Sequence, residues 1–147
     1  MQFASNSAYN SRRSPVPSAG GAVATSQPLA TQAGVDMLRI GGTAADAAVA
    51  AAAVLQVTQP CSTGLGGDAF CLYFESSSGR VHALNGSGRS PAALDRSRVA
   101  ADGFSNGLPP FHAYTVTVPG AAAAWQDTID RFGALSLSRV LEPARQI

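Results

Sequence analysis

The hydrophobic pattern of the first third of the chain predicts a short strand followed by a helix. Residues 21–26 are small or β-branched and predict a buried strand. A helix follows, because Pro28 suits a first helical turn and Gly41 stands where such a helix would end. Between them, apolar residues repeat at the spacing of one helical face: Leu29, Ala33, Met37 and Ile40.

A second helix is predicted over residues 44–57, where most positions are alanine. Thr43 can cap its first turn, and Asp46 lies where a carboxylate meets the free amides of that turn. Pro60 follows the segment and ends it. Because alanine is small, neighbouring backbone can approach this helix closely, so we expect it to be packed between layers.

The remainder of the chain alternates strand-like and helix-like segments. Its predicted strands are a hairpin and one later strand: 69–75, 80–85 and 114–118. Its predicted helices are 92–101, 121–132 and a segment from 137 onward, with Gly133 in the position that follows a helix. This alternation indicates a layered α/β fold. Because the pattern stops at Ile147 in mid-element, we expect further strands of the domain to lie beyond this chain.

Composition narrows the class of protein. Ten Arg and no Lys oppose nine acidic residues, so the basic excess that nucleic acid or an anionic membrane requires is absent. The alanine-rich uncharged stretch 47–67 contains polar residues and a glycine cluster, which argues against a transmembrane helix. Residues 1–18 are polar and without period, and they predict a flexible arm ahead of one domain at 19–147. The arm shows no signal-peptide pattern, so we expect a cytoplasmic protein.

A glycine-rich run at residues 64–69 formally fits a dinucleotide-binding pattern. A helix is predicted before it and a strand after it, which reverses the order that places a pyrophosphate at a helix N-terminus. We therefore interpret the run as a structural loop, formed by Gly64, Gly66, Gly67 and Asp68. If Gly66 or Gly67 adopts a positive φ or abuts another backbone segment, a valine there should destabilise the fold.

The cysteines and histidines do not form a compact metal-ligand pattern. The residues considered as ligands are widely spaced: Cys61, Cys71, His82, His112 and Asp68. We expect neither a metal site nor a cofactor. Cys71 lies in a strand-like run, which favours a buried free cysteine. No serine stands in a nucleophile elbow and nothing local activates a thiol, so the residues alone nominate no catalytic group.

Four segments carry a further signal when they are taken together and in order. They are ATSQPLATQAG at 24–34, GGTAADAAVA at 41–50, QPCSTGLGGDAF at 59–70, and VPG at 118–120 with EPA at 142–144. In this order and spacing they resemble the γ-glutamyltransferase (glutathione hydrolase) family, across about residues 12–147. The loop LNGSGRSP at 84–91 is similar to the glutathione hydrolase-like branch that lacks a signal peptide.

The resemblance implies a four-layer αββα sandwich of the N-terminal nucleophile class, of which this chain holds an incomplete N-terminal portion. It also implies a proenzyme that cuts itself into a large and a small subunit. The new N-terminal Thr of the small subunit attacks the γ-glutamyl amide of a substrate such as glutathione, with its own α-amine as base. The segments that hold the nucleophile and the oxyanion-hole glycines lie outside these residues. The implied partners are a small γ-glutamyl substrate and the remainder of the protein's own chain.

The sequence departs from the family at the substrate-binding arginine. Typical members carry R-E-x-A-P, whose Arg can hold the substrate α-carboxylate through two hydrogen bonds. Counting back four residues from Pro91 gives Ser87, and Arg89 lies two residues nearer the proline. We name Arg89 and Ser87 as substrate-binding candidates, with an ion pair to a structural carboxylate as the alternative role of Arg89. Two other functions stay open: a non-catalytic truncated product or scaffold, and a related amidohydrolase that acts on a different amide.

Overall fold

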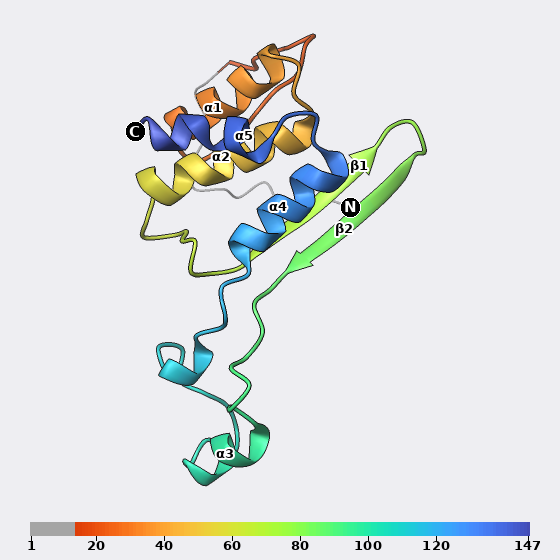
Figure 1. Ribbon diagram of the computed structural model, residues 1–147. Coiled ribbons are helices and arrows are strands. Elements are labelled where there is room, and N and C mark those ends of the chain that lie inside the picture. The colour runs from red at the N-terminus through yellow and green to blue at the C-terminus, as the bar shows by residue number, and fades with distance from the viewer. Residues whose placement is uncertain (1–13) are drawn as a thin grey trace.

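The computed structural model describes residues 14–147, which form a layer of helices beside a two-stranded sheet. The helices are α1 Pro28–Arg39, α2 Ala44–Thr58, α3 Arg96–Ala101, α4 Ala121–Phe132 and α5 Leu137–Arg145. The strands are β1 Ala69–Glu75 and β2 Arg80–Gly86. The hairpin lies along α4, whereas α3 stands in a lobe that extends away from the other helices (Figure 1).

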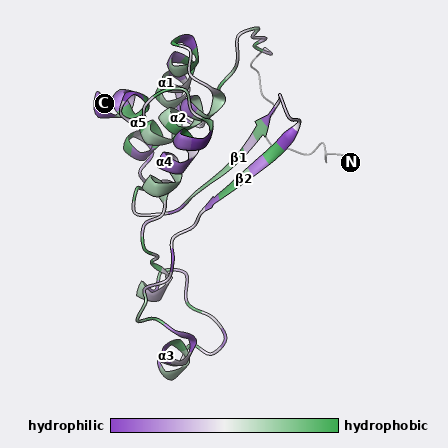
Figure 2. Cartoon of the chain, turned by 45° about the vertical axis from the view of Figure 1, so that its right-hand side comes forward, coloured by the Kyte–Doolittle hydropathy of each residue, from purple (hydrophilic) through white to green (hydrophobic). Residues whose placement is uncertain are grey.

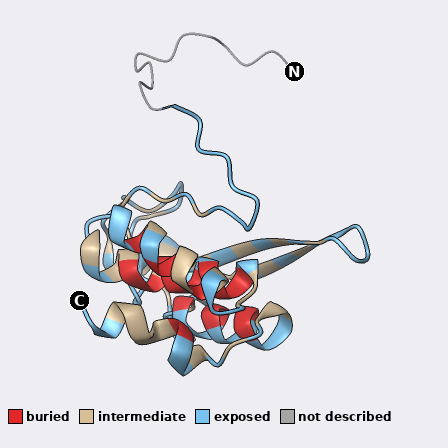
Figure 3. Ribbon diagram, turned by 90° about the horizontal axis from the view of Figure 1, so that it is seen from above, coloured by how far each residue is buried: buried red, intermediate tan, exposed pale blue. Residues whose placement is uncertain are grey.

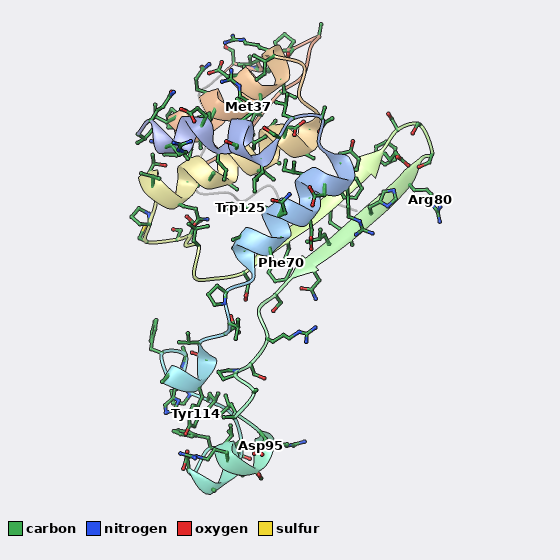
Figure 4. The ribbon with its side chains drawn as sticks, in the orientation of Figure 1. Met37, Phe70, Arg80, Asp95, Tyr114 and Trp125 are labelled. Atoms are coloured by element: carbon green, nitrogen blue, oxygen red, sulfur yellow. The ribbon has the colours of Figure 1, made fainter. Side chains whose placement is uncertain are left out.

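Helix α2 lies at the centre of the helical layer, as its alanine-rich sequence predicts. It packs against α1, α4 and α5, and most of its residues are buried (Figure 3). The backbones approach closely beside α1, because a Cβ atom at Gly34 would stand 3.0 Å from the carbonyl oxygen of Ala47. Met37 of α1 and Trp125 of α4 belong to one hydrophobic cluster with the buried residues of α2 (Figure 4). Small side chains in α2 therefore allow the close packing of this core.

Local signals set the helix ends near the predicted positions. Helix α1 begins at Pro28, and the Gln27 side chain caps its first turn. Gly41 follows the helix with a φ of 91°, a left-handed conformation that glycine adopts readily. Thr43 and Asp46 form a reciprocal capping box at the start of α2. These ends were predictable because each depends on residues within one helical turn.

The predicted hairpin is confirmed, and β1 pairs with β2 in antiparallel register along its whole length. One face of the sheet turns toward α4, where the rings of Tyr73 and Phe132 stack with centroids 4.4 Å apart. The opposite face is apolar and between 61% and 77% exposed at four residues: Phe70, Leu72, Phe74 and Val81. Hydrophobic positions accordingly run along both strands (Figure 2). The sheet thus has one covered face and one uncovered apolar face.

Two predicted strands are wrong. Residues 21–26 are irregular and mostly exposed, although Val23 packs partly against the core. Residues 114–118 form the end of a short 3-10 helix, Ala113–Thr115, followed by irregular chain. Within residues 14–147 the sheet contains only β1 and β2, so neither segment has a strand to pair with. β-Propensity alone does not make a strand without such a partner.

Three further expectations need correction or restriction. The helix predicted at 92–101 begins at Arg96, because the side chain of Asp95 caps it. Cys71 is a free cysteine, but it is half-buried rather than buried. Of the predicted arm, residues 1–13 lie outside the described part of the chain, and residues 14–18 are irregular and exposed. No helix within residues 14–147 is long and apolar enough to cross a membrane.

Candidate functional site

Three loops meet beside the start of α4, and together they contain both predicted substrate-binding residues. We call residues 64–68, 86–90 and 117–120 the three-loop junction. The carboxylate oxygen Oδ1 of Asp68 accepts hydrogen bonds from the Gly88 amide at 2.6 Å and the Thr117 hydroxyl at 3.3 Å. The Val118 amide donates to the carbonyl oxygen of Arg89 at 2.8 Å. Each loop is therefore bonded to at least one of the others.

Helix α4 anchors the junction through the backbone amides at its N-terminus. Its N-cap is Gly120, which supplies no side chain to bond the free amides of the first turn. The carbonyl oxygen of Gly67 accepts from the amides of Gly120 and Ala121, at 3.0 Å each. A loop carbonyl thus satisfies donors that a helix start leaves open, and it fixes the glycine loop against α4.

Glycine is required at several positions of the junction because backbone segments approach so closely. A Cβ atom at Gly88 would stand 1.9 Å from the carbonyl oxygen of Val118, and one at Gly120 would stand 2.3 Å from that of Gly86. These distances are far below any carbon–oxygen contact, so a side chain there would force the loops apart.

The sequence directed attention to other glycines, Gly66 and Gly67. A Cβ atom at Gly66 meets nothing within 4 Å, and one at Gly67 would lie 3.3 Å from the carbonyl oxygen of Gly64. Neither residue has a positive φ. The expected strain is therefore absent at Gly66, and only Gly67 has a close backbone neighbour. The close approaches lie at 86, 88 and 120 instead.

Ser87 and Arg89 are both exposed at the junction. The Ser87 amide donates to the side-chain oxygen of Asn85 at 3.0 Å, which shapes the turn after β2. Among the residues described, no carboxylate lies within ion-pair distance of the Arg89 guanidinium. The alternative role of Arg89, an ion pair with a structural carboxylate, therefore has no support within residues 14–147. Substrate binding by these two residues stays a prediction.

An open pocket of about 440 Å³ lies along the glycine loop. Its lining includes Gln56 of α2, residues 60–64, and Gly66, Gly67 and Asp68. The loop is tied to the end of α2, because the Thr63 hydroxyl donates to the carbonyl oxygen of Leu55 at 3.1 Å. Within residues 14–147, no three side chains of His, Cys, Asp or Glu lie close enough together to hold a metal ion.

Sequence reasoning missed the bonds that assemble the junction. The sequence predicts Asp68 in a structural loop, but its partners Gly88 and Thr117 stand 20 and 49 residues away. For Thr117 the sequence predicts a strand position and no functional role. No local pattern announces bonds between such distant residues, because capping and turn signals act within a few positions.

The lobe that carries α3 has its own cluster of polar groups. The Tyr114 hydroxyl donates to the carboxylate of Asp102, and the Arg98 guanidinium donates to the same oxygen at 3.0 Å. These bonds, the tyrosine first, hold the pKa of Asp102 below its ordinary value of 3.8. Asp95, the cap of α3, and Tyr114 both lie in this lobe (Figure 4).

We expect the α3 lobe to open in acid before the helical core does. A carboxylate whose pKa is lowered by folding stabilises the folded state at pH values above its ordinary pKa. For Asp102 this contribution is lost as the pH falls below 3.8 and through the pKa of the folded state. The protection factors of the α3 amides, which compare each exchange rate with its intrinsic value at the same pH, should therefore fall below about pH 3.8, while those of α2 stay high. In Asp102→Asn the α3 amides should be less protected at neutral pH and should lose part of the acid dependence. The rest belongs to Asp95, whose pKa is also lowered by its hydrogen bonds to Ser97 and the Arg98 amide. An acid transition that is unchanged in this variant would contradict the assignment.

Comparison with known proteins identifies the family. Residues 30–147 match the family Gamma-glutamyltranspeptidase. The glutathione hydrolase-like YwrD proenzyme of Bacillus subtilis is 42% identical over 123 residues, which is 80% of this chain and 22% of that protein. The chain spans between 22% and 26% of the length of the first four curated relatives that it matches.

Solved structures agree with the family match. The γ-glutamyltranspeptidase of Helicobacter pylori superimposes with a TM-score of 0.78 at 28% identity, covering 89% of this chain and 38% of that one. A cephalosporin acylase of Bacillus halodurans superimposes with a TM-score of 0.76 at 43% identity, covering 94% of this chain and 27% of that one. The chain therefore has an incomplete portion of the predicted N-terminal nucleophile fold. By both its sequence and its structure, the chain belongs to the gamma-glutamyltranspeptidase family.

Proposed function

We propose that this chain is the N-terminal part of an enzyme that cleaves γ-glutamyl amides such as glutathione. A threonine outside these residues serves as the nucleophile, and the remainder of the protein supplies it after self-cleavage. The observation that carries the proposal is the family match over residues 30–147. The name of the Bacillus subtilis relative, a glutathione hydrolase-like proenzyme, supports both the substrate class and the processing.

In this proposal the three-loop junction binds the substrate. The Arg89 guanidinium is exposed and has no acidic partner among the described residues, so it is free to bind a carboxylate. A planar guanidinium can donate two parallel hydrogen bonds to the α-carboxylate of a glutamyl group. The nearby Ser87 hydroxyl adds one further donor or acceptor. The chain thus contributes recognition of the acyl group, and the missing segment contributes the attack.

A chimera tests the proposal. The matching N-terminal segment of the Bacillus subtilis relative is replaced by this chain, and processing and hydrolysis of a chromogenic γ-glutamyl anilide are measured. We expect a self-cleaved product that releases the aniline. The control chimera carries alanine in place of the relative's nucleophilic threonine. A folded and processed chimera without γ-glutamyl release would refute the substrate class.

A related acylase that acts on a different amide is the second candidate function. The 43% identity to a cephalosporin acylase favours it, as does Ser87 at the position where the family pattern R-E-x-A-P has arginine. The same chimera distinguishes the two, because its rates can be compared on a γ-glutamyl anilide and on an anilide whose acyl group lacks a carboxylate. Preference for the second substrate would favour the other acylase.

Arg89→Ala should raise the KM of the chimera for the γ-glutamyl anilide by about 10- to 100-fold, because a charge-assisted contact to the carboxylate is lost. The contact to the carboxylate is made in both the bound substrate and the transition state, so kcat should change less than KM. Arg89→Lys should restore activity only partly, since an ammonium group cannot replace the planar fork. Arg96→Ala removes an exposed arginine of α3 and is the matched control. Equal KM values for all variants would exclude Arg89 from substrate binding.

A further inference from the structure

We propose that Asp68 is a positioning residue that holds the loop 87–89 in the geometry needed to bind substrate. The inference rests on the proposed function of Ser87 and Arg89 in that loop. Asp68 does not itself contact the substrate in this proposal. It acts through the backbone of Gly88, which lies between the two substrate-binding candidates in the sequence.

The hydrogen bonds of Asp68 place it at the centre of the three-loop junction. Its Oδ1 atom accepts the Gly88 amide at 2.6 Å, a short bond of the charge-assisted kind. The same oxygen accepts the Thr117 hydroxyl at 3.3 Å, which joins the third loop to the first two. One carboxylate oxygen of Asp68 therefore binds two segments that lie 20 and 49 residues further along the chain.

A second bond fixes the loop at the next residue. The carbonyl oxygen of Arg89 accepts the Val118 amide at 2.8 Å, so the peptide group before Gly88 and the one after Arg89 are both held. Asp68 is itself fixed, because the neighbouring Gly67 carbonyl bonds the first amides of α4. The connection thus runs without interruption from helix α4 through residues 67–68 to the loop 87–89.

Asp68 does not neutralise Arg89 within residues 14–147. The carboxylate of Asp68 is bonded to an amide and a hydroxyl, and no ion pair between it and Arg89 occurs in the described structure. A guanidinium that is not bound to a neighbouring carboxylate can bind the carboxylate of a substrate. Asp68 therefore fixes the loop backbone while the charged side chain of Arg89 remains available.

The first experiment measures the loop in the isolated chain. Amide hydrogen exchange of Gly88 is compared in wild type, Asp68→Ala and Asp68→Asn. We expect about tenfold faster exchange in the alanine variant, the factor that corresponds to about 1.4 kcal/mol. Asparagine should exchange more slowly than alanine but faster than wild type, because its amide oxygen can accept both bonds without the negative charge. Asp127→Ala removes an exposed carboxylate of α4 and should leave Gly88 exchange at the wild-type rate.

The second experiment measures substrate binding in the chimera. Asp68→Ala should raise the KM for the γ-glutamyl anilide about tenfold with a smaller change in kcat, and Asp68→Asn should restore most of the lost affinity. Thr117→Val removes only the weaker bond and should raise KM about two- to threefold. If Asp68→Ala does not fold, Asp68→Asn and Thr117→Val still test the proposal through Gly88 exchange and KM.

The outcomes separate this inference from the proposed function. Gly88 exchange that does not depend on Asp68, or an active chimera whose KM does not change in Asp68→Ala, overturns the positioning role and leaves the proposed function intact. An asparagine variant that behaves like alanine also overturns it, because the acceptor role is then wrong. A folded and processed chimera without γ-glutamyl activity refutes the proposed substrate class, while the exchange data still report whether Asp68 fixes the loop.

Discussion

Replacing Asp46 by alanine should destabilise the chain by about 3–5 kcal/mol, because three backbone amides lose the buried carboxylate that accepts their hydrogen bonds. The Asp46 carboxylate is fully buried. It accepts the amides of Thr43 at 2.7 Å, Ala134 at 2.9 Å and Leu135 at 3.3 Å. The first amide belongs to the α1–α2 turn and the other two belong to the α4–α5 turn. One side chain thus joins both turns. Chemical denaturation of wild type and variant measures the expected loss in the free energy of unfolding.

Two variants make this experiment specific. Asp46→Asn should lie between alanine and wild type, because both carboxylate oxygens accept amides and asparagine offers only one oxygen. Asp127→Ala removes an exposed carboxylate and should change the unfolding free energy by less than about 0.5 kcal/mol. If Asp46→Ala unfolds at the same denaturant concentration as Asp127→Ala, the buried carboxylate does not stabilise the fold.

Gly86→Val should destabilise the chain by about 3 kcal/mol or more, because there is no space for even the first side-chain atom. A Cβ atom at Gly86 would stand 2.3 Å from the Cβ of Ala124 and 2.6 Å from the carbonyl oxygen of Ala69. The first contact is to α4 and the second is to β1, so the variant must separate the hairpin from the helix or break the strand pairing. Thermal unfolding followed by circular dichroism measures the loss.

Gly66→Val is the matched control for this glycine. It places the same side chain in a neighbouring loop, where nothing lies within 4 Å of the added carbon. We expect its unfolding temperature to stay close to that of wild type, because open surface positions usually change stability by less than about 0.5 kcal/mol. Equal losses in both variants would show that close packing at Gly86 is not the cause.

The helices were predictable from the sequence because their signals are local. Pro28 and the Thr43–Asp46 capping box each lie within a turn of the helix end that they set. Gly133 also stands at the predicted end of α4, but glycine is needed there because of close packing and not because of its backbone conformation. A Cβ atom there would meet the Asp46 carboxylate at 2.7 Å, and its φ of −78° is open to any residue.

The predicted strands and the loop junction depend on partners elsewhere in the chain. The hairpin was predictable because its strands are adjacent in sequence, whereas residues 21–26 and 114–118 have β-propensity but no described strand beside them. Ser87 and Arg89 could be named from a resemblance. The bonds of Asp68 to Gly88 and Thr117 could not be predicted, since nothing near Asp68 in the sequence indicates them.

The Asp46 carboxylate has a consequence for folding during synthesis. Its partners Ala134 and Leu135 follow it by 88 and 89 residues. When α1 and α2 leave the ribosome, those amides have not yet been made, so water must hydrate the carboxylate until the α4–α5 turn emerges. Burial of an unpaired carboxylate is unfavourable, and α2 therefore completes its packing late, together with the C-terminal helices.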